Sequence, residues 1–145
     1  MDPAVVADRI FPVLGGLGYA DVAPEVLDQM AAGPALDPAV GPHVRATVGR
    51  WIGTGDPEPA GCGIALLLDE SSDAAQAAAD GLAEIAEEVD VGGQPCYRYG
   101  DDVGTRYLTL CTPGMLLYLV GHDDGRLAEV AALLFEGWRA AGTAA

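Results

Sequence analysis

The stretch Cys62-Gly63-Ile64-Ala65-Leu66-Leu67-Leu68-Asp69 is an unbroken apolar run that ends in an acid. Successive side chains of a strand point to opposite faces, so this run would be apolar on both. Such runs are typical of central strands that are covered on both sides. We therefore predict a buried central strand here and expect Leu67 to be fully buried in it.

The residues after this strand predict a helix, three strands and a second helix. Apolar positions with helical spacing predict a helix over residues 72–90, which Gly92-Gly93 would end. The three strands fall at about residues 95–100, 105–111 and 115–121, separated by the turns Asp101-Asp102-Val103-Gly104 and Thr112-Pro113-Gly114-Met115. A final amphipathic helix is predicted over residues 124–141. Residues 62–141 thus predict an α+β core whose sheet has about four strands.

The positions of the two turns predict the pairing of the strands and the faces of the sheet. With the first turn centred on its two middle residues, Tyr97 lies opposite Leu108. The same register places Arg98 on one face with Tyr107 and Tyr118. We expect both core helices to cover the other, more apolar face together. The mixed face would then be covered by the N-terminal helices, or by a ligand or partner.

The first third of the chain predicts a helical N-terminal segment. Short helices are expected over residues 2–11 and 24–32. Residues 42–52 fit a strand by alternation of apolar residues, and they also fit a helix with one apolar face. Proline near the start and glycine just past the end favour the helix. We therefore predict one domain, residues 1–145, with residues 1–53 helical and residues 54–61 a linker to the core.

The charge of the chain is strongly negative. Its 145 residues hold 22 acids and 7 basic residues, all arginine, which gives a formal net charge of −15. Such a surface repels nucleic-acid phosphates and anionic membranes, and it attracts basic protein partners. The N-terminus lacks the basic start and apolar stretch of a signal peptide, and no apolar run approaches the ~20 residues of a membrane-spanning helix. We therefore expect a soluble, cytoplasmic protein that binds neither nucleic acid nor membranes.

Five residues are candidates for binding a ligand or partner. Arg98, in a predicted strand interior, could pair with a carboxylate and stack on the rings of Tyr107 or Tyr118. We also expect that an internal acid could pair with Arg98. Asp69 and Glu70 follow the central strand, at the end where open α/β sheets often place ligand groups. Both acids also fit an ordinary loop before a helix.

Motifs for metal, cofactor or covalent chemistry are missing from the sequence. His122 and Asp123 stand at a strand-to-helix junction and could ligate a divalent ion, but an acid at that place fits a helix cap better. The three cysteines form no C-x-x-C pair, and there is no G-x-S-x-G elbow and no phosphate loop ending in G-K-[ST]. We expect no metal, no cofactor and buried, reduced thiols.

These features favour a non-enzymatic acidic protein-interaction module, such as an adaptor, an inhibitor or a secretion-type chaperone. The alternative is a small ligand-binding or enzymatic domain with a pocket between the sheet and the N-terminal helices. A deep polar pocket on the mixed face would favour the alternative, and a flat or filled face would favour protein interaction.

The order of elements over residues 62–141 resembles the later half of roadblock-type dimerisation modules. The likeness rests on that order and on apolar patterning. The first third of the chain departs from it, because no opening hairpin is predicted there. A homodimer is accordingly one candidate assembly.

The negative charge leads to a prediction about salt. Repulsion among like charges destabilises a compact chain, and added salt shortens the screening length from ~10 Å at about 0.1 M to ~3 Å at about 1 M. We expect the melting temperature to rise with added NaCl in a thermal denaturation series. A flat or falling series would show that local ion pairs outweigh the net repulsion.

Overall fold

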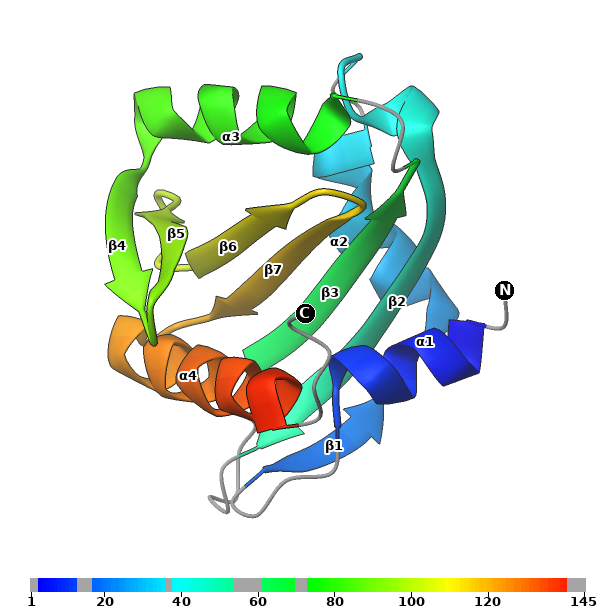
Figure 1. Cartoon of the computed structure of the whole chain (residues 1–145), viewed down its shortest axis with the longest axis vertical. Helices are drawn as coiled ribbons and strands as arrows, with labels where there is room; N and C mark the ends of the chain where they lie inside the picture. Colours follow the sequence, from blue (N-terminus) through cyan, green and yellow to red (C-terminus); the bar gives the residue numbers. More distant parts are fainter. Residues whose placement is uncertain (1–2, 13–16, 36–37, 54–60, 70–72, 141–145) are drawn as a thin grey trace.

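A computed structural model of the chain describes residues 3–12, 17–35, 38–53, 61–69 and 73–140. Within these residues the fold is α+β, with seven antiparallel strands in one open sheet and four α-helices packed on it (Figure 1). The helices are α1 (Pro3–Ile10), α2 (Pro24–Ala35), α3 (Ala74–Ile85) and α4 (Asp124–Ala140), and a short 3-10 helix spans Gly41–His43. The strands are β1 (Gly18–Asp21), β2 (Val44–Gly53), β3 (Gly61–Leu68), β4 (Glu87–Val91), β5 (Gln94–Gly100), β6 (Arg106–Thr112) and β7 (Met115–Gly121), in the sheet order β1-β2-β3-β7-β6-β5-β4. None of the described helices is both long enough and apolar enough to cross a membrane.

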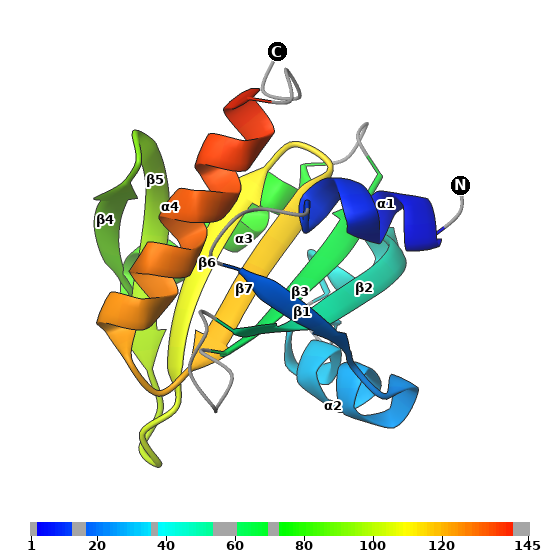
Figure 2. The ribbon, with the colours of Figure 1, turned by 90° about the horizontal axis from the view of Figure 1, so that it is seen from below.

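The four helices are divided between the two faces of the sheet. Figure 2 shows α1 and α4 on one side of the strands and α3 on the other. We call these the α1/α4 face and the α2/α3 face. The prediction that both core helices share one face was wrong. Because β3 is buried on both sides, with Ala65 in one core and Leu66 in the other, a helix of the core has to cover each side.

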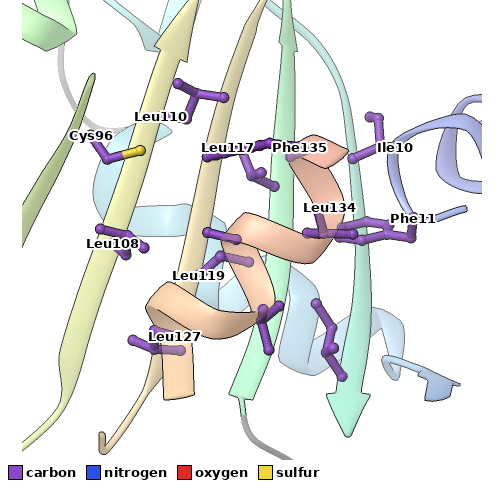
Figure 3. Packing of buried hydrophobic residues seen from close by; sticks show 14 of the residues in the cluster. Ile10, Phe11, Cys96, Leu108, Leu110, Leu117, Leu119, Leu127, Leu134 and Phe135 are labelled. Carbon is purple, nitrogen blue, oxygen red and sulfur yellow. The ribbon is translucent and has the colours of Figure 1, made fainter. Parts of the chain in front are cut away.

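The larger apolar core lies on the α1/α4 face. Side chains from α4 point toward the sheet, and Ile10 and Phe11, at the end of α1, belong to the same core (Figure 3). The core residues shown and labelled are Ile10, Phe11, Cys96, Leu108, Leu110, Leu117, Leu119, Leu127, Leu134 and Phe135. The indole Nε1 of Trp138 donates a hydrogen bond of 2.8 Å to the carbonyl of Ile10, which ties α4 to the end of α1.

A smaller core lies on the α2/α3 face. Its members are the small or branched residues Ala31, Val40, Leu66, Leu68, Ala74, Ala78 and Leu116. The alanines let α3 approach the sheet closely, near the turn between β6 and β7. Further along β6, toward its turn with β5, this face carries tyrosines. The cover of this face is therefore incomplete.

Residues 42–52 form a strand, so the preference for a helix there was wrong. β2 spans Val44–Gly53 and pairs with both β1 and β3. Val48 and Ile52 lie in the core of the α1/α4 face, as the alternating pattern predicts. The partner strands satisfy the backbone of β2, and this long-range pairing outweighs the local end signals that favoured a helix. β1 was not predicted, so the N-terminal segment is not all helical, and the prediction of about four strands was too low for a sheet of seven.

The helix predicted over residues 72–90 stops early. α3 ends at Ile85, and Glu87–Val91 form the edge strand β4. Gly92 and Gly93 have φ values of +57° and +88°, and they join β4 to β5 as a two-residue hairpin. Two consecutive residues with positive φ are typical of the type I′ hairpin turn, so these glycines signal a strand pair here and not a helix end.

The pairing of β5 with β6 differs by one residue from the prediction. Tyr97 lies opposite Thr109, and Arg98 lies opposite Leu108. The turn holds three residues between Asp101 and Thr105, closed by a 3.0 Å bond from the Asp101 N–H to the Thr105 carbonyl.

An odd loop length exchanges the faces of one strand relative to its partner. Gly104, with φ of +89°, supplies the left-handed position that three-residue hairpin loops require. Arg98 therefore faces α4, and Tyr99 joins Tyr107 on the α2/α3 face. The assignment of Arg98 to the face of Tyr107 was wrong for this reason.

Other parts of the predicted core are confirmed. β3 is a central strand between β2 and β7, and α4 begins and ends within a residue of its prediction. α1 and α2 confirm the two short N-terminal helices, although α2 continues to Ala35. The prediction that Leu67 is fully buried was wrong, because this side chain is only half-buried, whereas Ala65 and Leu66 are fully buried. Gly61 belongs to β3, and the rest of the predicted linker lies outside the described residues.

Leu66 provides a test of the smaller core. Its side chain is 0% exposed beneath α2 and α3. Leu66→Ala should lower the free energy of unfolding by about 2–5 kcal/mol, as large-to-small changes do in packed cores. The control Ile85→Ala, at a side chain 71% exposed, should cost less than about 0.5 kcal/mol. Urea denaturation measures both, and equal costs would contradict the two-core arrangement.

Candidate functional site

A cleft of about 730 Å³ opens on the α2/α3 face. It lies between α2 and the turn that joins β5 to β6. The sheet supplies its floor, and α2 and the turn supply its sides. The lining residues are Gln29, Met30, Ala31, Ile64, Leu66, Tyr99, Gly100, Asp101, Thr105, Tyr107, Tyr118 and Val120. Most of this lining is aliphatic or aromatic, and the turn adds polar groups at one side.

Three tyrosines from three strands supply the aromatic part of the cleft lining. Tyr99 of β5 and Tyr107 of β6 are direct cross-strand partners, and their rings stack with centroids 4.8 Å apart and planes 11° from parallel. Tyr118 of β7 lies along the same face. Burial raises the pKa of both Tyr99 and Tyr107, because the charged phenolate would lose its hydration. The cleft therefore presents neutral phenols at ordinary pH.

Asp101 is the carboxylate of the cleft. Its Oδ1 accepts backbone N–H bonds from Val103 at 3.0 Å and from Thr105 at 2.9 Å, so it organises the β5–β6 turn. Slight burial opposes ionisation, but the hydrogen bonds from Thr105 and Val103 outweigh it and hold the pKa of Asp101 below its ordinary value. Burial is the main cause that raises the pKa of Tyr107, and the negative charge of Asp101 raises it further. Asp101 therefore places a negative charge beside Tyr107 at ordinary pH.

The hydroxyl of Thr109 lies beneath this group. Thr109 is 0% exposed, and among the described residues its Oγ1 has no hydrogen-bond partner. The same hydroxyl lowers the pKa of Tyr99 as a hydrogen-bonding neighbour would, although burial dominates. Tyr99 and Thr109 are thus close neighbours without a hydrogen bond between them. Tyr99 is consequently held by stacking and burial.

The structure brings together two of the five predicted binding residues. Tyr107 and Tyr118 both line the cleft. Arg98 lies on the opposite face, where its guanidinium is 3.0 Å from Glu87 and 4.0 Å from Asp124. An internal acid does pair with Arg98, but the acids come from β4 and α4 and not from the N-terminal helices. These surface pairs are partly exposed and contribute little to stability.

The other predicted residues that the structure describes are not part of the cleft lining. Asp69 follows β3, and its carboxylate is 3.1 Å from the guanidinium of Arg45. Glu70 lies outside the described residues. His122 is exposed, with Nδ1 3.4 Å from the Gly104 carbonyl. Asp123 caps α4, because its Oδ1 accepts the N–H of Gly125 at 2.8 Å.

Sequence reasoning missed Tyr99, Asp101 and the lining of α2. Tyr99 was placed on the other face by the one-residue error in the turn. The glycine at position 104 was the signal for the longer loop, because three-residue loops carry glycine at their last position. Asp101 was interpreted as ordinary turn chemistry, which its bonds to the turn confirm, but its place on the cleft depends on the fold. No local pattern places α2 beside this turn.

The three thiols carry no sign of reactivity. Burial raises the pKa of Cys62 and Cys111 to about 11 and that of Cys96 to about 12, and all three are free. Such thiols stay protonated, and the thiolate is the reactive form. In the part of the chain that the structure describes, no three His, Cys, Asp or Glu side chains gather as a metal site requires.

Comparisons of the chain with protein-family models, with curated proteins and with solved structures found no match. The resemblance of residues 62–141 to roadblock-type modules therefore stays a prediction. The cleft and the charge of the chain are the observations on which a function can be proposed.

The stacked tyrosines lead to a prediction about alkaline pH. A phenol whose pKa is raised by folding stabilises the protein below the unfolded value of 10.0, and that contribution is lost as pH rises through the folded value. We expect Tyr99→Phe to remove a late-titrating phenol from the ultraviolet titration curve. The variant should also lose less stability than the wild type between about pH 9 and 11. The contrary result is that the phenol lost in Tyr99→Phe titrates in the wild type at or below the ordinary pKa, which would show that Tyr99 is solvated.

Proposed function

We propose that the protein is a non-enzymatic binding module whose tyrosine-lined cleft holds a segment of a partner protein. The segment would carry apolar side chains next to basic ones. The observation that carries this proposal is the cleft itself, whose described lining is largely apolar and includes one carboxylate, that of Asp101.

The shape and chemistry of the cleft support binding. The α2/α3 face, which carries Tyr107 and Tyr118, has a largely apolar cleft. It is therefore neither flat nor filled, as protein interaction predicted, nor a deep polar pocket, as the alternative predicted. An apolar floor binds aliphatic or aromatic side chains by removing them from water. Tyrosine adds a polar hydroxyl to a rigid apolar ring, which makes it frequent at interfaces. Among the residues that the structure describes, the lining includes no serine, cysteine or histidine that would suggest a nucleophile or a base.

Charge favours a basic partner. The chain has a formal net charge of −15. At the cleft, Asp101 is part of the lining, and its neighbour Asp102 is exposed. On α2, Asp28 is exposed beside the lining residue Gln29. These carboxylates complement lysine and arginine in a partner, and such complementarity raises association rates and selects partners.

The size of the cleft favours a second candidate, a domain that binds a small ligand. Its volume of about 730 Å³ falls within the range of small-molecule sites, roughly 300–1,000 Å³. The same chemistry would select an apolar molecule. In that case, mass spectrometry of the natively purified protein would show a bound small molecule. That molecule would be lost in the variant Met30→Trp, whose larger side chain fills part of the cleft.

Selection from a random-peptide display library tests the proposal. We expect peptides that combine apolar residues with arginine or lysine to be enriched on the wild-type protein. Met30→Trp places a large ring at the α2 side of the cleft and should weaken the enriched peptides by at least about tenfold, which corresponds to 1.4 kcal/mol. Affinities are measured by titration of the synthetic peptides.

Val5→Trp is the matched control. Val5 is also an apolar helical residue, but it is 53% exposed and belongs to α1, on the opposite face. This variant should bind the peptides as the wild type does. Enrichment of acidic peptides, or equal loss in both variants, would overturn the proposal.

A further inference from the structure

We propose that the cleft receives the guanidinium group of an arginine side chain, which stacks on a tyrosine ring and pairs with Asp101. This inference rests on the proposed function and specifies the group that the partner inserts. It assigns the tyrosines and Asp101 to one recognition site.

The aromatic rings supply the first half of the site. A cation is attracted to the negative face of an aromatic ring, and arginine stacks on such rings because its guanidinium is planar. Tyr99, Tyr107 and Tyr118 all line the cleft, and the first two are held parallel by their stacking. These rings are positioned by three neighbouring strands, so they are set before a ligand arrives.

Asp101 supplies the second half. Its Oδ1 is occupied by the N–H groups of Val103 and Thr105. A carboxylate offers about four lone-pair sites, so the two bonds within the turn leave acceptor capacity for a guanidinium. Those same bonds fix the orientation of the carboxylate and keep it ionised. The turn thus prepares an oriented negative charge at the side of the rings.

The cation has to come from outside the cleft. Its described lining includes no arginine, lysine or histidine. Arg106 is near in sequence, but it lies on the other face and its Nε donates a bond of 2.9 Å to Asp124. Arg98 pairs with Glu87 on that face as well. Rings and a carboxylate without an internal cation form an incomplete group, which an external arginine completes.

A pair of short peptides tests this directly. The probes are acetyl-Leu-Arg-Leu-amide and the same peptide with citrulline in place of arginine, which keeps the shape but removes the charge. We expect the arginine peptide to bind the wild-type protein about 3- to 30-fold more tightly, the range for cation–π contacts. Chemical shifts of the backbone amides, followed by nuclear magnetic resonance, report both affinities and the site of binding.

Two variants identify the groups that bind the charged guanidinium of the arginine peptide. Asp101→Asn keeps an oxygen acceptor for the turn but removes the negative charge, so it should reduce the preference for the arginine peptide and leave the affinity of the citrulline peptide unchanged. Tyr118→Leu removes a ring without touching the turn and should also weaken the arginine peptide selectively. The control is Tyr97→Leu, since Tyr97 is on the same face but outside the lining.

The outcomes separate this inference from the proposed function. If both peptides bind the cleft equally, the cleft holds apolar segments and the arginine site is wrong. If the arginine peptide binds more tightly but keeps its affinity in both Asp101→Asn and Tyr118→Leu, the charge is read elsewhere and the inference also falls. If neither peptide shifts the cleft amides, the inference falls, and the display selection decides the proposed function by itself.

Discussion

The burial of β3 on both of its faces is the constraint on which the rest of the structure depends. Ala65 lies in the core beneath α4, and its neighbour Leu66 lies in the core beneath α2 and α3, both 0% exposed. An apolar strand of this kind is stable only if helices cover both sides of its sheet. Gly63 shows how closely the cover fits, because an added Cβ would lie 2.6 Å from the ring of Phe11. Two cores therefore share one strand.

The two cores are unequal, and the difference creates the cleft. On one face α4 packs along the sheet and is tied to α1 by Trp138. On the other face α3 is rich in alanine and packs near the β6–β7 turn, so the tyrosines toward the opposite turn lie beyond it. Stacking and hydroxyl groups let Tyr99 and Tyr107 remain half-buried there. The incomplete cover is what makes this face available for binding.

The arginines of the β5–β6 region serve the opposite face. Arg106 forms two bonds with Asp124, at 2.9 and 3.0 Å, and this pairing is the main cause that lowers the pKa of Asp124. Because Asp124 begins α4, its negative charge also suits the positive end of the helix dipole. Arg98 and Arg106 both lie near Asp124 at the start of α4, so neither of them neutralises Asp101 at the cleft. The distribution of charge between the faces thus follows from the register of one hairpin.

The sequence by itself determined the elements whose signals are local. The unbroken apolar run of β3, the amphipathic pattern of α4 and the cap at Asp123 all rely on neighbouring residues, and each was placed correctly. Only the tertiary structure decided which strands pair with β2, which face of the sheet each helix covers and which side chains lie beside Tyr107. The physical reason is that register and coverage depend on partners distant in the chain: one additional residue in the turn before Thr105 moved Tyr99 into the cleft and Arg98 out of it.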